Sequence, residues 1–117
     1  MPESLFSLQV AFTLLQARFV LEVSQKFPNY ELTDGDSFRD PRVHGILGEK
    51  MGYGHKNSAH KKRLARDYNL FINGVYQLST EAHRPLGELW ESLHPRARWG
   101  GRFQDGNHYS FEHDGIM

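Results

Sequence analysis

The strongest local constraint on the fold of this chain is the stretch at residues 70–76, which reads Leu-Phe-Ile-Asn-Gly-Val-Tyr. Asn73 and Gly74 stand between apolar, β-forming residues, and an Asn-Gly pair in this setting is typical of a two-residue β-hairpin turn. The sequence therefore predicts an antiparallel hairpin. Asp67 is expected on, or just before, its first strand.

A long apolar stripe precedes the hairpin, near the start of the chain. Its members recur at spacings of three and four residues, which places them on one face of a helix: Leu5, Leu8, Phe12, Leu15 and Phe19. The pattern predicts a core helix over residues 3–27. Polar residues interrupt the run well short of the ~20 apolar residues of a membrane span, so we expect no membrane insertion; these are Gln9, Gln16, Arg18 and Glu22.

Weaker patterns complete the order of elements. Residues 30–33 and 108–111 are expected to form strands, and Asp40-Pro41 is a typical start for a helix that stops at Gly52. A further helix is expected from about Pro85, whereas Trp99-Gly100-Gly101 is expected to break regular structure. This order indicates an α+β fold in which a small antiparallel sheet packs with about three helices. Residues 1–117 are expected to form a single domain.

Charge and composition narrow the classes of partner. Lys plus Arg and Asp plus Glu are equal, at 14 each, so no overall field attracts nucleic acid or an anionic membrane. The local basic cluster at residues 56–66 is interpreted as a solvated face, and we expect no nucleic-acid partner and a monomeric protein. The chain has no cysteine, so nitrogen and oxygen atoms must hold any transition metal.

Three short sequences supply such atoms: Ser58-Ala59-His60, Ala65-Arg66-Asp67 and Asp105-Gly106-Asn107-His108. His60, Asp67 and His108 match the three protein ligands of a catalytic zinc site with one open position. Asp105 lies close to His108 and is a candidate general base towards a water molecule at that position. Arg39 is a candidate for stabilising the developing oxyanion.

The spacing of His60 and Asp67 adds a condition. On a continuous helix they would lie ~10.5 Å apart along the axis, too far for ligands ~2.0–2.2 Å from one zinc ion. The chain must therefore turn between them, as the hairpin allows. Strand alternation then places Ala65, Asp67 and Asn69 on one face.

Each residue also has a simpler interpretation. His60 alone would more often be a surface or core histidine, and Asp105 a turn residue. Asp67 could merely support the hairpin, and Arg39 could pair with a neighbouring aspartate. His113 would be the best substitute for His108 as a ligand.

The sequence Ser58-x-His60 followed by Ala65-x-Asp67 resembles the SxHxxGxAxD signature of the zinc D-alanyl-D-alanine peptidases. This family includes VanX- and VanY-type enzymes and phage endolysins that cut L-alanyl-D-glutamate bonds. Trp99-Gly100-Gly101 and Asp105-x-x-His108 resemble its closing motif, WGG followed by DxxH. Residues 35–41 resemble its arginine-bearing loop. The resemblance covers about residues 30–117, and Arg63 replaces the glycine of the signature.

The resemblance implies a single zinc-peptidase domain in which His60, Asp67 and His108 bind zinc and Asp105 is the general base. Arg39 would contact the substrate, although Arg42 lies close by and the choice between them stays open. Ser58 and Trp99 would support the site or meet the substrate.

The activity that the resemblance implies is cleavage of peptidoglycan stem peptides by a phage endolysin, at the L-alanyl-D-glutamate bond. Such a protein would accumulate in the host cytoplasm until it is released to the cell wall. D-alanyl-D-alanine carboxypeptidase or dipeptidase activity is one alternative. The other is a non-catalytic, metal-stabilised module of a phage particle that binds peptidoglycan, whose site would be closed by a fourth protein ligand.

Overall fold

The computed structural model describes residues 4–35, 59 and 62–117. Its elements are the helices α1 (Leu5–Lys26) and α3 (Arg84–Leu93) and the strands β1 (Tyr30–Asp34), β2 (Ala65–Ile72), β3 (Val75–Tyr76), β4 (Ala97–Trp99) and β5 (His108–Phe111), with 3-10 turns at Glu81–His83 and Gly100–Phe103. The mixed α+β class with a small antiparallel sheet is confirmed. The helix expected after Asp40-Pro41 lies outside the described residues.

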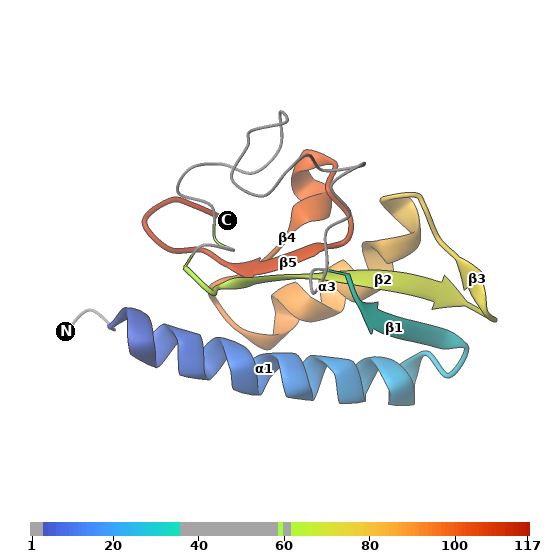
Figure 1. The fold of residues 1–117 in the computed structure, drawn as a ribbon, viewed down its shortest axis with the longest axis horizontal. Coiled ribbons are helices and arrows are strands. Elements are labelled where there is room, and N and C mark those ends of the chain that lie inside the picture. The colour runs from blue at the N-terminus through green and yellow to red at the C-terminus, as the bar shows by residue number, and fades with distance from the viewer. Residues whose placement is uncertain (1–3, 36–58, 60–61) are drawn as a thin grey trace, which may run out of the picture.

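The sheet is antiparallel throughout and has the order β1-β2-β5-β4, with β3 paired to β2 (Figure 1). The Asn73-Gly74 turn joins β2 to β3 as predicted. Both residues have positive φ, 51° and 78°, as a type I′ turn requires. β2 is the central strand, and its neighbour β5 comes from the far end of the chain.

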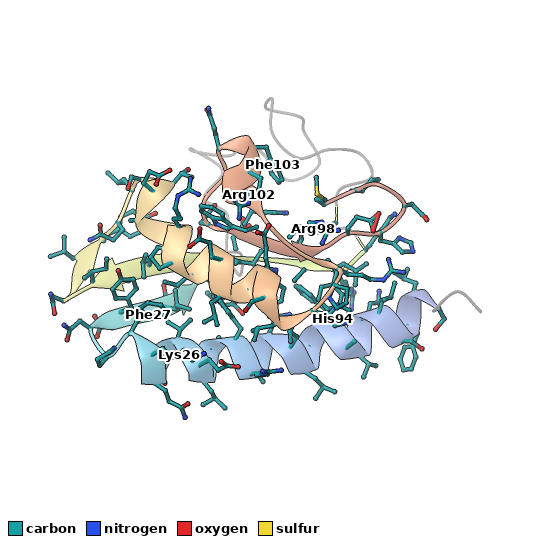
Figure 2. The ribbon with its side chains drawn as sticks, turned by 180° about the vertical axis from the view of Figure 1, so that it is seen from behind. Lys26, Phe27, His94, Arg98, Arg102 and Phe103 are labelled. Carbon is teal, nitrogen blue, oxygen red and sulfur yellow. The ribbon has the colours of Figure 1, made fainter. Side chains whose placement is uncertain are left out.

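α1 and α3 cover one face of the sheet and enclose the core with it (Figures 1 and 2). Phe19 of α1 packs its ring 5.3 Å from the ring of Trp90 of α3 and 5.1 Å from that of Tyr109 of β5. The indole N–H of Trp90 donates a hydrogen bond of 3.0 Å to the carbonyl oxygen of Ser110. A buried indole thus ties α3 to β5, the strand that carries a predicted metal ligand.

The N-terminal helix is confirmed with slightly shorter bounds, since Ser4 caps it by accepting a hydrogen bond from Ser7 N–H. Leu5 is exposed, unlike the rest of the predicted stripe. Two of the polar residues in the apolar run bond to β2 and the loop before it: Gln9 Nε2 donates to Lys62 O at 2.8 Å, and Gln16 Oε1 accepts from Tyr68 Oη at 3.1 Å. These interruptions therefore dock the helix on the sheet.

A second set of apolar residues lies on the opposite, exposed side of α1: Phe6, Val10, Leu14 and Leu21. By length and composition alone, α1 is the one helix within the described ranges that could cross a membrane. A core helix meets the same criteria, and five α1 side chains are buried in the core: Leu8, Phe12, Leu15, Phe19 and Val23. The expected absence of membrane insertion stays a prediction.

The strand β4 was not predicted. We expected irregular structure at Trp99-Gly100-Gly101, but Trp99 ends β4, opposite Tyr109 of β5, and the two glycines begin the 3-10 turn. Short alternation over three residues carries too little pattern to reveal a strand.

Candidate metal centre

Asp67 and His108 lie directly opposite each other in the β2–β5 ladder. Residues opposite each other in an antiparallel pair project from the same face of the sheet. Their neighbours Tyr68 and Tyr109 enter the core, so Asp67 and His108 project from the face that α1 and α3 leave uncovered. Both side chains are largely buried, with 16% and 7% of their surface exposed.

The separation of the two side chains fits a shared metal ion. His108 Nδ1 lies 3.4 Å from Asp67 Oδ1, beyond the usual 2.7–3.2 Å of an N–H···O hydrogen bond. Two ligand atoms ~2.1 Å from one zinc ion lie ~3.4 Å apart at the tetrahedral angle. The structure thus brings together two of the three predicted ligands, one imidazole and one carboxylate.

Three predicted site residues, Arg39, Ser58 and His60, lie outside the described residues, as does Arg42. Within the described ranges, no group of three His, Asp or Glu side chains is placed to hold a metal ion. The described neighbours of these positions contact β2 or the residue before it: Gly35 N–H donates to Asp67 O at 2.9 Å, and Leu64 N–H donates to Ala59 O at 2.8 Å. The role of His60 as third ligand stays a prediction.

Asp105 lies in the turn that leads into β5. Its carbonyl oxygen accepts a hydrogen bond of 3.1 Å from His108 N–H, and its own N–H donates to Gly100 O at 2.8 Å. Its side chain is exposed. The turn thus ties a solvent-accessible carboxylate to the strand that begins with His108.

Trp99, Gly100 and Gly101 support this turn. Trp99 is fully buried, and its indole N–H donates a hydrogen bond of 2.7 Å to Gly106 O. A Cβ atom at Gly100 would clash with the carbonyl oxygen of Asp105 and would lie 2.6 Å from the Cβ of His108. The burial of Trp99 favours a supporting role over direct contact with a substrate.

Arg63 stands where the family signature that this chain resembles has glycine. Its φ of 58° lies in the left-handed region, which favours glycine because a side chain crowds the backbone there. Arginine therefore stands in a backbone conformation that glycine would adopt more easily.

Phe103 and His83 were not predicted as site residues. The ring of Phe103 lies 5.8 Å from the imidazole of His108, edge to face, and is 46% exposed. Figure 2 shows Phe103 beside Arg102 on the turn after β4.

His83 Nδ1 is 2.7 Å from Tyr109 Oη in the interior. No sequence spacing links His83 to Tyr109, and only the fold brings them together.

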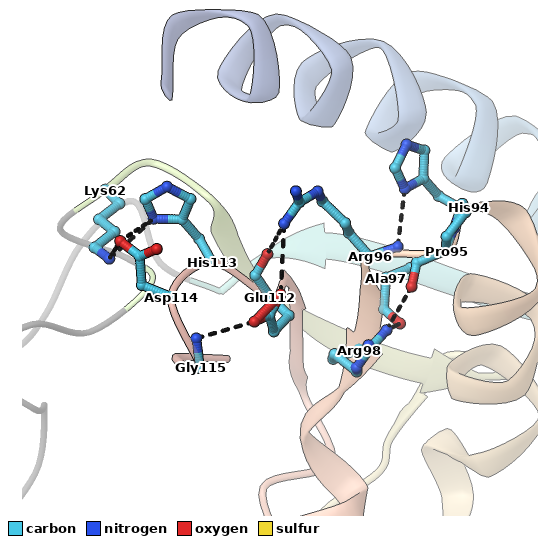
Figure 3. Close-up of polar contacts among 10 residues, drawn as sticks. All are labelled: Lys62, His94, Pro95, Arg96, Ala97, Arg98, Glu112, His113, Asp114 and Gly115. Carbon is cyan, nitrogen blue, oxygen red and sulfur yellow. Dashed lines mark hydrogen bonds and ion pairs between the residues drawn. The ribbon is translucent and has the colours of Figure 1, made fainter. Parts of the chain in front are cut away.

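His113, the substitute ligand, lies in a different cluster (Figure 3). Its Nδ1 is 3.0 Å from Lys62 Nζ and 3.6 Å from Asp114 Oδ2. Arg66, another member of the basic cluster, pairs with Asp34 at 2.8 Å. These two cations are therefore engaged with groups of the protein itself.

We compared the chain with protein-family models, curated proteins and solved structures, and none of them matches it.

Proposed function

We propose that this protein is a zinc metallopeptidase that cleaves peptidoglycan stem peptides, with the L-alanyl-D-glutamate bond as its target and a phage endolysin as its biological role. The observation that carries the proposal is the 3.4 Å separation of Asp67 Oδ1 and His108 Nδ1 on the face of the sheet opposite α1 and α3. The similarity of residues 58–67 and 99–108 to the two family motifs supports it. An endolysin would stay in the host cytoplasm until it reaches the cell wall.

The residues divide into two groups by role. Asp67, His108 and the predicted ligand His60 would hold the zinc ion, which would supply Lewis-acid polarisation and a water molecule of lowered pKa. Asp105 would accept the proton of the attacking water because its carboxylate is exposed and its turn leads directly into His108. Arg39 or Arg42 would contact the substrate.

Metal content provides the first test. Purified protein should retain one zinc ion per chain, and His60→Ala and His108→Ala should each abolish zinc retention and hydrolysis. Zinc retention by both variants would remove the proposed ligand set.

The role of Asp105 can be separated from metal binding. Asp105→Ala should abolish hydrolysis while zinc remains bound. Asp114→Ala should keep both, since Asp114 is an exposed carboxylate that lies close to Lys62 and His113. Loss of zinc from Asp105→Ala would instead indicate a fourth ligand and a closed structural site.

The bond cleaved follows from a digest of Gram-negative sacculi with and without chelator, analysed by mass spectrometry. Chelator-sensitive release of stem peptides that begin with D-glutamate is the expected result. Loss of terminal D-alanine alone would identify a carboxypeptidase. No fragments from folded, zinc-loaded protein would favour the peptidoglycan-binding module.

A further inference from the structure

A pocket lined in part by Asp105 includes none of the predicted metal ligands. It holds about 200 Å³ and is lined by residues 76–80, His83 and residues 104–107. Pockets that enclose a whole small ligand measure ~300–1,000 Å³. This pocket therefore suits one residue-sized group of a larger substrate that also reaches Asp105.

The lining of the pocket is polar and nearly uncharged. Asp105 is the one carboxylate among the lining residues, which include no lysine or arginine. Most of the others have amide or hydroxyl side chains: Gln77, Ser79, Thr80, Gln104 and Asn107. The side-chain amides of Gln104 and Asn107 make no hydrogen bond with other described residues. Tyr76 adds a half-exposed aromatic ring at one side.

A buried histidine completes the wall. His83 is only 3% exposed, and Tyr109 Oη occupies its Nδ1 at 2.7 Å. Its other ring nitrogen has no partner within the described part of the chain. Burial lowers the pKa of His83 to about 4, so the imidazole is neutral at neutral pH and offers the pocket a hydrogen bond without a charge.

The two segments that line the pocket, residues 76–80 and residues 104–107, pack closely against each other. A Cβ atom at Gly106 would lie 2.6 Å from the Cα of Thr80, and Gly106 O accepts the hydrogen bond of the Trp99 indole. Gln104 has a φ of 63°, a conformation that rarely hosts a residue with a side chain. Its side chain thus starts from a constrained backbone at the wall of the pocket.

We infer that this pocket is a subsite for the N-acetylated sugar to which the stem peptide is attached. The inference rests on the proposed function. A sugar ring with hydroxyl and acetamido groups matches a wall of amides, hydroxyls, a neutral imidazole and one aromatic ring. One alanine and one lactyl unit separate the sugar from the L-alanyl-D-glutamate bond, a span of roughly 7 Å at ~3.5 Å per unit. Asp105 lines the pocket, and its turn leads directly into His108, a predicted metal ligand.

The test compares two substrates with the zinc-loaded protein. One is a stem peptide with N-acetylmuramic acid on its amino end, and the other is the same peptide without the sugar. The sugar-bearing peptide should have the higher kcat/KM, through a lower KM. Gln104→Ala should reduce this preference about fivefold, the value of one hydrogen bond of ~1 kcal/mol. Gln25→Ala on exposed α1 is the matched control and should keep the full preference.

Equal kcat/KM values for the two substrates would overturn the sugar subsite and leave the proposed peptidase intact. If neither substrate is cleaved, titration of the protein with N-acetylmuramic acid decides the question by NMR. Shifts of the Gln104 and Asn107 side-chain amides would support the subsite although the peptidase proposal fails. Their absence at millimolar sugar would overturn it.

Discussion

At the scale of single residues, Arg63 has a left-handed backbone conformation that favours glycine. The left-handed backbone costs a residue with a side chain roughly 1–2 kcal/mol, and glycine would avoid that cost but lose more entropy on folding. We predict that Arg63→Gly raises the free energy of unfolding by up to about 1 kcal/mol, measured by urea denaturation. Arg63→Ala, which keeps the strain and removes only the guanidinium, is the control. An equal rise in both variants would show that the charge, and not the backbone, was responsible.

His83 makes the stability of the fold depend on pH. Its folded-state pKa, about 4, lies below the ~6.5 of an unfolded histidine. Below pH 6.5 the unfolded chain therefore binds a proton that the folded chain excludes. The free energy of unfolding should fall as pH decreases from about 6.5 to about 4, at roughly 1.4 kcal/mol per pH unit for this residue.

The contribution of His83 is measured as the difference between the wild type and His83→Gln in denaturation at several pH values. Glutamine keeps a hydrogen-bonding group near Tyr109. Burial raises the pKa of Tyr109 further above its usual value, so this residue does not titrate in the same pH range. The difference should change between pH 6.5 and 4 and stay constant above pH 7. Parallel curves throughout that window would contradict the assignment.

At the scale of elements, the Trp99-Gly100-Gly101 sequence supports the turn that carries Asp105 and leads to His108. Because a side chain at Gly100 would meet Asp105 O and His108, Gly100→Ala should displace the turn. We predict a zinc affinity at least tenfold lower, with circular dichroism that still shows a folded protein. Gly115→Asn is the control, since Gly115 has open space around it and a φ of 77° that asparagine tolerates. Zinc affinity unchanged in Gly100→Ala would separate this glycine from the site.

The elements that could be predicted are those with a strong local pattern. The Asn73-Gly74 turn, the α1 stripe and the helix expected from about Pro85 each have a signal within a few neighbouring residues. β4 could not be predicted because it is three residues long and is defined by its pairing with β5. The facing of Asp67 and His108 was expected from their chemistry, but their register depends on pairing between distant segments, which sequence spacing does not encode.

At the scale of the whole molecule, one face of the sheet contributes to the core and the other carries the predicted metal ligands Asp67 and His108. Side chains from α1, α3 and the strands form the aromatic core on one face, while Asp67 and His108 stand on the other. The strands β2 and β5, which carry them, are central and pair directly with each other. A metal ion held by both would link two distant parts of the chain, and its binding energy would add to folding stability.

Zinc should therefore stabilise the protein measurably. At a free concentration one hundred times its dissociation constant, a ligand that binds only the folded state adds about 2.7 kcal/mol, or roughly 10 °C in Tm for a domain of this size. We predict that EDTA lowers the Tm by this order and that added zinc restores it. Asp67→Asn removes a ligand with almost no change in shape and should abolish the response. Asp34→Asn, which removes the charge that pairs with Arg66, should retain it. If zinc raised the Tm of Asp67→Asn as much as that of the wild type, Asp67 would not be a ligand. The metal would then bind elsewhere and would not link β2 to β5.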